Sequence, residues 1–205
     1  MKIIHFFDYK SPYAYLAQEA AYALAGDYGI DVEWQPYTLD IPAYLGAAAL
    51  DAEGRDTVQT RNAHQWRRVK YSYLDCRREA NRRGLVVRGP RKIFDSSIAH
   101  IGFLYAREHG AWRRYHDHVF EAFWKRELDI ETPAVIAAEL ERAGVPAAGF
   151  TAWLAGDGRA VHDRLRREAD EAGVFGVPSW LVDGELFWGA ERLERVRELV
   201  ERART

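Results

Sequence analysis

The order of the predicted elements places this chain in the α/β fold class. A β-prone segment, a helical segment and a second β-prone segment open the sequence of 205 residues. Two β-prone segments followed by a helix close it, and the stretch between has helical periodicity with almost no strand signal. This order predicts one small sheet whose two halves are separated by a helical insertion.

The opening β-α-β unit is predicted from hydrophobic patterning. Residues 3–7 form a continuous apolar run that is typical of a buried strand. From Tyr13, apolar residues recur every three or four positions, which predicts a helix that ends near Gly26. Residues 30–34 alternate in polarity and predict a second strand, parallel to the first.

The middle of the chain is predicted to be helical. Gly84 and Gly144 stand where helices should end, and Thr132-Pro133 is typical of a cap followed by proline in the first turn. We therefore expect an all-helical insertion subdomain at residues 39–172. Its predicted helices span residues 57–83, 95–109, 111–127, 132–143, 147–155 and 158–172.

The closing β-β-α unit has a strong turn signal. Asp183-Gly184 joins two β-prone runs, residues 179–183 and 185–188, and predicts a hairpin. An amphipathic helix is expected at residues 191–203. The complete order is that of a thioredoxin-like fold, with a discontinuous domain at residues 1–38 plus 173–205.

Composition excludes several classes of function. The net charge of −2 argues against a protein that binds nucleic acid by neutralising phosphates. No apolar run approaches the roughly 20 residues of a membrane helix. The first residues lack the layout of a signal peptide, so we expect a cytoplasmic protein.

Sulfur and metal chemistry within the chain is also restricted. Cys76 is the one cysteine, so no internal disulfide or cysteine-based zinc site can form. No histidine pair has the four-residue spacing of a helical zinc site, and we expect no metal. The many aromatic residues (7 Trp, 11 Tyr, 9 Phe) indicate a large packed core, an aromatic-lined pocket for a flat ligand, or both.

Ser11-Pro12 lies at the predicted turn from the first strand to the first helix. Ser11 is typical of a helix cap, and a helix start also stabilises a nearby anion. Both readings remain open: a cap alone, or a cap whose hydroxyl donates to a bound thiolate and lowers its pKa. Thioredoxin-like proteins carry a C-x-x-C pair at this turn, where this chain has Ser11-Pro12-Tyr13-Ala14. Any reactive thiol must therefore come with a ligand.

A second candidate site precedes the third predicted strand. Pro178 has no N–H donor and suits the first residue of a strand. A cis Val177–Pro178 bond would turn the backbone of Val177 toward an extended, peptide-like ligand.

These motifs carry a family resemblance along the whole chain. Residues 7–17 (FDYKSPYAYLA) resemble the opening of 2-hydroxychromene-2-carboxylate isomerases and kappa-class glutathione transferases. Residues 173–189 (GVFGVPSWLVDGELFWG) are similar to their C-terminal signature. Tyr71, Asp75, Arg78 and Gly84-Leu85 resemble the mid-chain pattern of the same family.

The resemblance implies a fold, a cofactor and a set of contacts. It implies a thioredoxin-like domain with a DsbA-type helical insertion, usually dimeric, that binds glutathione. By resemblance, Ser11 is the catalytic residue facing the glutathione sulfur, beside Pro12. Val177, before a cis Pro178, would pair its backbone with the cysteinyl unit. Ala190 and Glu191 would hold the γ-glutamyl end.

Two segments depart from the family pattern. The family commonly has an aspartate where this chain has Ala190-Glu191. Residues 52–62 lack the family's Gly-Asn step, prolines and lysine, and Asn62, Arg68 and Lys70 are candidates for the missing roles.

The sequence thus predicts a homodimeric, glutathione-dependent isomerase of a small aromatic or unsaturated carboxylate, in the catabolism of aromatic compounds. One alternative is a kappa-like glutathione transferase or peroxidase, which uses the same thiolate but consumes glutathione. The other is a non-catalytic DsbA-like protein that binds extended peptides beside the proline.

Overall fold

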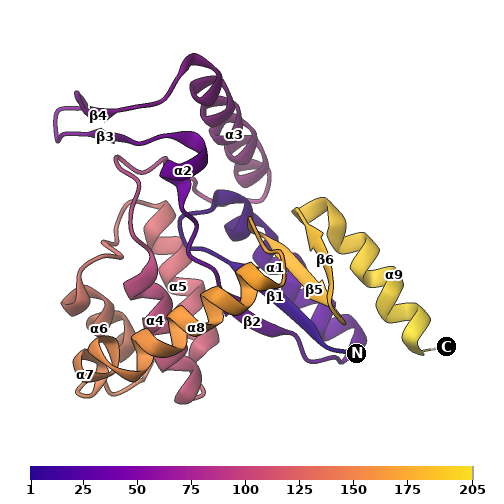
Figure 1. Ribbon diagram of the computed structural model, residues 1–205. Helices are drawn as coiled ribbons and strands as arrows, with labels where there is room; N and C mark the ends of the chain where they lie inside the picture. Colours follow the sequence, from indigo (N-terminus) through magenta and orange to yellow (C-terminus); the bar gives the residue numbers. More distant parts are fainter. Residues whose placement is uncertain (205) are drawn as a thin grey trace.

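The computed structural model describes residues 1–204 and has a four-stranded mixed sheet at its centre (Figure 1). The strand order is β2-β1-β5-β6. Strand β1 (Ile3–Phe7) pairs in parallel with β2 (Glu33–Pro36) and antiparallel with β5 (Ser179–Val182), which forms a hairpin with β6 (Glu185–Trp188). The two ends of the chain therefore build one sheet, which confirms the predicted fold class.

Two helices complete the sheet domain. Helix α1 (Pro12–Tyr28) runs past Gly26, the predicted end, and stops at Gly29, which adopts the left-handed conformation at φ 60°. Apolar spacing alone could not distinguish the two glycines. Helix α9 (Leu193–Arg204) follows a 3₁₀ turn, η1 (Ala190–Arg192), and packs against α1 and β5.

The insertion contributes the remaining helices. Helix α4 (Ser97–Glu108) lies at its centre, in contact with α5, α6, α7 and α8. All the predicted helices are present, but the first begins six residues later than expected, at Ala63. The insertion helices are α2 (Ile41–Leu45), α3 (Ala63–Arg82), α4, α5 (Trp112–Trp124), α6 (Pro133–Arg142), α7 (Phe150–Ala155) and α8 (Asp157–Glu171).

The insertion is not all-helical, which corrects the sequence prediction. Strands β3 (Ala48–Leu50) and β4 (Asp56–Gln59) form an antiparallel hairpin. Every residue of β4 is exposed, so the hairpin has no apolar alternation that patterning could detect. Its turn is held by Asp51, whose carboxylate accepts hydrogen bonds from the Arg55 amide (2.9 Å) and guanidinium (2.8 Å).

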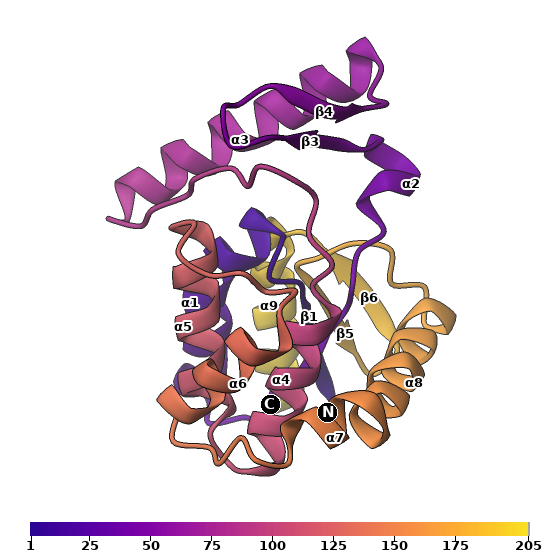
Figure 2. The ribbon, with the colours of Figure 1, turned by 90° about the vertical axis from the view of Figure 1, so that its left-hand side faces the viewer.

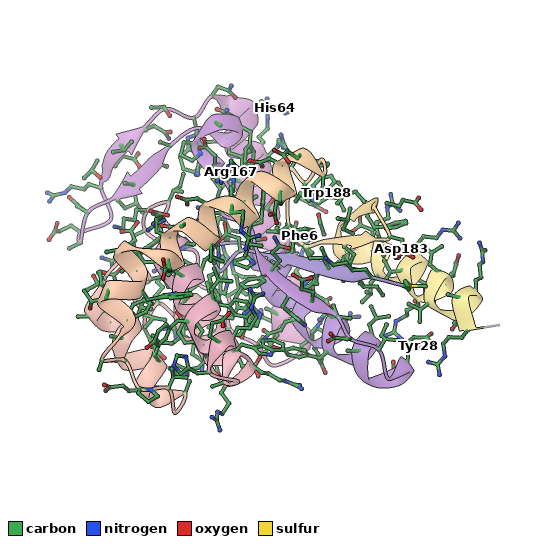
Figure 3. All side chains as sticks on the ribbon, turned by 60° about the horizontal axis from the view of Figure 1, so that its bottom comes forward. Phe6, Tyr28, His64, Arg167, Asp183 and Trp188 are labelled. Carbon is green, nitrogen blue, oxygen red and sulfur yellow. The ribbon has the colours of Figure 1, made fainter. Side chains whose placement is uncertain are left out.

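Helix α3 and the β3–β4 hairpin form an arm that projects from the rest of the molecule (Figures 1 and 2). The chain enters the arm through α2 and returns to the body through the segment between α3 and α4 (Figure 2). In Figure 3, His64 marks the arm, Phe6 lies within the body, and Tyr28 and Asp183 lie at the opposite end.

The interior is rich in aromatic rings, as one reading of the composition predicted. His5 is fully buried between Trp34 (ring centroids 4.6 Å apart) and Trp180 (4.9 Å). Burial lowers the pKa of His5 to about 3, so the imidazole is neutral near pH 7. No helix of residues 1–204 is long and apolar enough to cross a bilayer.

Two helix glycines predict opposite effects of the same substitution. A Cβ at Gly102 would lie 2.3 Å from the Tyr115 hydroxyl and 2.7 Å from Ile136 Cγ2, whereas nothing lies within 4 Å of one at Gly26. We expect Gly102→Ala to lower the free energy of unfolding by about 1–3 kcal/mol. Gly26→Ala should raise it by about 0.5–1 kcal/mol. Urea denaturation measures the free energy of unfolding of both variants. A Gly102→Ala protein as stable as wild type would contradict the close packing of Gly102 against Tyr115 and Ile136.

Candidate active site

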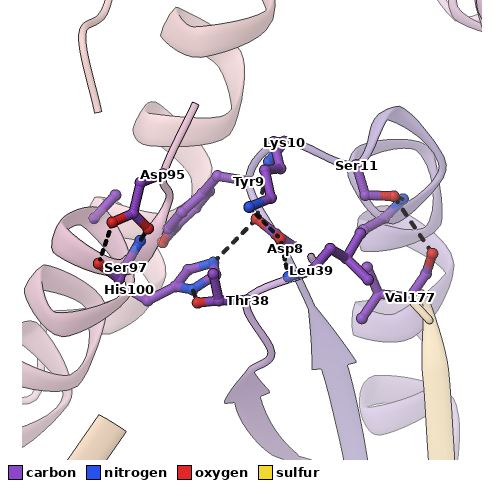
Figure 4. Close-up of polar contacts among 12 residues, drawn as sticks. Asp8, Tyr9, Lys10, Ser11, Thr38, Leu39, Asp95, Ser97, His100 and Val177 are labelled. Atoms are coloured by element: carbon purple, nitrogen blue, oxygen red, sulfur yellow. Dashed lines mark hydrogen bonds and ion pairs between the residues drawn. The ribbon is translucent and has the colours of Figure 1, made fainter. Parts of the chain in front are cut away.

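Ser11 caps helix α1 and reaches the chain just before β5. Its side-chain oxygen accepts a hydrogen bond from Ala14 N (3.2 Å) and donates one to Val177 O (3.4 Å) (Figure 4). The residue is 6% exposed, so this hydroxyl is held in a nearly closed environment. The contact to Val177 O is long, and rotation of the hydroxyl would redirect its proton to a bound anion.

The first turn of α1 leaves one backbone donor available. Pro12 has no N–H, Ser11 N donates to Asp8 O (3.0 Å), and Ala14 N donates to the cap. Tyr13 N has no acceptor among the described residues. With the positive end of the helix dipole, this N–H and the Ser11 hydroxyl can stabilise one negative charge.

Val177 supplies the opposite wall of this site. The Val177–Pro178 bond is cis, and Ser179 Oγ donates to Gly176 O (2.7 Å), which fixes the loop. The Val177 N–H donates no hydrogen bond within residues 1–204, although the residue is only 7% exposed. A buried, unpaired N–H is suited to an extended ligand that pairs with the backbone.

Ser11 and Val177 open into a cavity of about 980 Å³. This volume lies at the upper end of the range of ligand sites, about 300–1,000 Å³, and leaves room for two small molecules. The arm and the segment before α4 line much of it. Its aromatic side chains, suited to a flat ligand, are Tyr13, Tyr44, Trp66, Tyr73, Phe94, Phe175 and Trp188.

The cavity carries a strong excess of positive charge although the whole chain has a net charge of −2. Asp56 is the single acidic residue among those that line it. Such a concentration of cations attracts anionic ligands. The cationic lining residues are Lys10, Arg61, Arg68, Lys70, Arg77, Arg88, Arg91, Lys92 and Arg126.

Asp8 anchors the floor of the site. Its buried carboxylate accepts hydrogen bonds from Leu39 N (2.8 Å) and Lys10 N (3.1 Å), and lies 3.4 Å from His100 Nε2 (Figure 4). Burial alone would raise the pKa of Asp8, but the charges of Lys10 and His100 hold it well below its usual value. Asp8 is therefore ionised near pH 7.

Cys76 does not take part in this chemistry. It is fully buried, and burial raises the pKa of its thiol to about 12. A protonated, inaccessible thiol is not a nucleophile, so no sulfur of the chain itself can serve the site. Within residues 1–204, no group of three or more His, Cys, Asp or Glu side chains could hold a metal ion.

The structure brings together some of the predicted residues and separates others. Ser11, Pro12 and Val177 line the cavity, as do Arg68 and Lys70 from α3. Pro178 directly follows Val177 but is not among the lining residues.

The other predicted contacts lie outside the cavity. The side chain of Asn62 caps α3 by accepting from Gln65 N (2.9 Å), in a capping box with that residue. The spacing of Asn62 and Gln65 signals this box, so the sequence could have placed the helix start there. Ala190 and Glu191 are exposed residues of η1.

Sequence reasoning also missed several residues that line the site. Lys10 and Arg61 belong to the cavity, as do Phe175 and Trp188 at its rim. Lys10 gave one signal: a charged residue directly before Ser11, at the end of a buried strand. Phe175 and Trp188 both lie within the motif at residues 173–189, but nothing in their spacing showed that their rings meet, with centroids 4.9 Å apart.

Fold and site together define a thioredoxin-fold protein in which a serine-capped helix start replaces the cysteine pair. A family model described as the DSBA-like thioredoxin domain matches residues 2–201. The chain therefore belongs to the DSBA-like thioredoxin domain family.

Individual relatives are more specific. A 2-hydroxychromene-2-carboxylate isomerase from Pseudomonas putida is 28% identical over 196 residues, covering 94% of this chain and 91% of that protein. One from Sphingobium xenophagum is 27% identical over 191 residues, covering 92% of each. A solved structure of 2-hydroxychromene-2-carboxylate isomerase has a TM-score of 0.76 and 25% identity, covering 99% of this chain and 96% of that one. These similarities confirm the predicted resemblance.

Removal of the Asp8 charge should destabilise the fold in a pH-dependent way. We expect Asp8→Asn to lower the free energy of unfolding by about 3–5 kcal/mol near pH 7, because Lys10 loses its buried partner. The depressed pKa means that this contribution is complete above the unfolded value of about 4 and is lost at lower pH. The difference from wild type should therefore be constant from pH 7 to 5 and shrink below pH 4.

Denaturant titrations at several pH values measure this difference. Asp31→Asn, at an exposed carboxylate, is the control and should change stability by less than about 0.5 kcal/mol. An Asp8→Asn effect equal to that of the control would contradict the anchoring role.

Proposed function

We propose that this protein is a glutathione-dependent isomerase of a small aromatic or unsaturated carboxylate. The observation that carries the proposal is the Ser11 hydroxyl at the start of α1, 3.4 Å from Val177 O, where a large cationic and aromatic cavity meets an unpaired Val177 N–H. The similarity to proteins named 2-hydroxychromene-2-carboxylate isomerase supports the choice of isomerisation.

The residues present fit glutathione in shape and charge. The backbone of Val177 can pair with the cysteinyl unit, which leaves the sulfur toward Ser11. The cations of the arm, among them Arg68 and Lys70, are suited to the carboxylates of the tripeptide. The resemblance places Ala190 and Glu191 at the γ-glutamyl end; they are exposed residues of η1 and are not among those that line the cavity.

In this proposal, bound glutathione supplies a thiolate that adds to an activated double bond and is expelled after rotation about the resulting single bond. Ser11 donates its hydroxyl proton as a hydrogen bond toward the sulfur, and Tyr13 N–H and the helix dipole favour the same charge. The cavity walls orient the flat substrate and exclude water. Glutathione is returned unchanged, and the protein supplies no covalent nucleophile.

Loss of the Ser11 hydroxyl should slow isomerisation. A hydrogen bond to a charged group is worth about 1.5–3 kcal/mol, so Ser11→Ala should lower kcat/KM by about ten- to one-hundredfold. Bound glutathione should also need a higher pH to ionise, which the ultraviolet absorbance of the thiolate measures. 2-Hydroxychromene-2-carboxylate is the test substrate, and Ser11→Thr, which keeps the hydroxyl, is the matched control.

The mass balance of glutathione distinguishes the two enzyme classes. Complete recovery of free glutathione after many turnovers is expected for an isomerase. Progressive depletion would indicate a kappa-like transferase or peroxidase instead. If millimolar glutathione neither binds nor raises the melting temperature, the protein is better described as a non-catalytic peptide-binding member of its fold.

We also propose that the protein is a homodimer. The arm exposes large apolar side chains, including Tyr71 (61% exposed) and Leu74 (47%) on α3. Apolar residues of this size on an element that projects from the body are suited to burial against a second copy.

Analytical ultracentrifugation should give the mass of a dimer for wild type. The double substitution Tyr71→Glu with Leu74→Glu should shift the protein toward the monomer. A monomeric wild type at micromolar concentration would refute this assembly.

A further inference from the structure

Lys10 is a buried cation that the protein itself does not fully satisfy. Its ammonium lies 3.7 Å from Asp8 Oδ2, its side chain is 5% exposed, and it lines the same cavity as Ser11. Within residues 1–204 the ammonium donates no hydrogen bond; the bond of Lys10 to Asp8 comes from its backbone N–H. An ammonium has three donors, and because Lys10 lines the cavity, a ligand there can accept from them.

Asp8 holds Lys10 without using those donors. The carboxylate already accepts two backbone hydrogen bonds, from Leu39 N and Lys10 N. The ammonium–carboxylate distance of 3.7 Å is that of an ion pair and exceeds the 2.7–2.9 Å of a charge-assisted hydrogen bond. Asp8 therefore fixes the position of the ammonium and leaves donors for a ligand.

Lys10 and Ser11 leave the turn in different directions. In Figure 4, the Lys10 side chain extends toward Asp8 and the Ser11 side chain toward Val177. Both residues line the same cavity, so one small molecule bound there can contact both. Its reacting carbon would lie on the Ser11 side and its anionic group on the Lys10 side.

We propose that Lys10 binds the carboxylate of the second substrate, and so selects small conjugated acids over their neutral analogues. The role of this acid as the electrophile rests on the proposed function, whereas the carboxylate site rests on Lys10, Asp8 and the cavity. A carboxylate is the fitting ligand because it accepts charge-assisted hydrogen bonds from a desolvated ammonium. A neutral amide oxygen compensates that charge less well.

The charge surrounding Lys10 favours a second carboxylate despite the presence of Asp8. Two carboxylates of the chain act on Lys10: Asp8, which also accepts two backbone hydrogen bonds, and Asp95, whose pKa is lowered in part by the charge of Lys10. The rest of the cavity adds cations from the arm, among them Arg61 and Arg68. The lining of the cavity as a whole therefore carries an excess of positive charge, which offsets the two carboxylates near Lys10 and attracts an incoming anion.

Binding of a matched pair of probes tests this site without catalysis. The probes are cinnamate and cinnamamide, which share a flat conjugated skeleton and differ in charge. Calorimetry on the full chain without glutathione gives both dissociation constants. We expect wild type to prefer cinnamate, Lys10→Met to weaken cinnamate at least tenfold with cinnamamide changed less than about twofold, and Lys10→Arg to retain most of the preference.

Lys92→Met is the charge-matched control. Lys92 lines the same cavity, but its ammonium is exposed and already pairs with Glu131, so cinnamate affinity should change less than about twofold. Equal weakening by Lys92→Met and Lys10→Met would overturn the proposal, because it would indicate general attraction by the cavity. Equal affinity of wild type for the acid and the amide would overturn it too.

A crystal of wild type soaked with cinnamate keeps the test independent of how well Lys10→Met folds. A carboxylate within hydrogen-bond distance of Lys10 Nζ supports the site, and one held only by residues of the arm overturns it.

The two proposals fail separately. Normal Lys10-dependent selectivity with no thiolate and no isomerisation would refute the glutathione mechanism alone. Isomerisation with no selectivity would refute the carboxylate site alone.

Discussion

The buried carboxylate of Asp8 is the constraint on which the geometry of the site depends. It stands one residue after β1 and accepts from Leu39 N, beyond the end of β2, so it joins the ends of the two parallel strands. It also contacts His100 on α4 of the insertion. One ionised group thus holds the sheet, the insertion and the turn before Ser11 together. A buried charge is tolerated there because every side of it meets a donor or a cation.

The same network extends away from the cavity. The Thr38 hydroxyl lies 2.8 Å from His100 Nδ1 and 2.9 Å from His162 Nε2, which connects the end of β2 to α8. Burial lowers the pKa of His162 to about 4, so this imidazole is neutral near pH 7 and can accept from Thr38. The position of Ser11 therefore depends on polar contacts that cross from the sheet domain to two helices of the insertion, α4 and α8.

Local patterns in the sequence were sufficient for the sheet domain and for the centre of the site. The run at residues 3–7, the Asp183-Gly184 turn and the Ser11-Pro12 cap each have a local physical signature, and all three were placed correctly. The arm has no such signature. Its strands are exposed or half-buried, and its cations become a cavity wall only when α3, the hairpin and the segment before α4 meet. The role proposed for Lys10 likewise depends on its ion pair with Asp8 and on its position in the cavity. Neither can be predicted from the spacing of residues along the chain.

With Ser11-Pro12-Tyr13-Ala14 at the start of α1, the chain keeps the fold of its family but has no cysteine pair there for thiol–disulfide exchange. The helix start still offers a hydroxyl, one free N–H and a positive dipole end, which is an environment for stabilising a sulfur anion. The chain's own sulfur, Cys76, is sealed in the core with a raised pKa. In the proposed function, this anion site acts on a ligand that brings its own thiolate. The adjacent cationic cavity would then take a second, anionic molecule, and the proposed division between two neighbouring residues, Ser11 and Lys10, would hold the sulfur and its target at the same time.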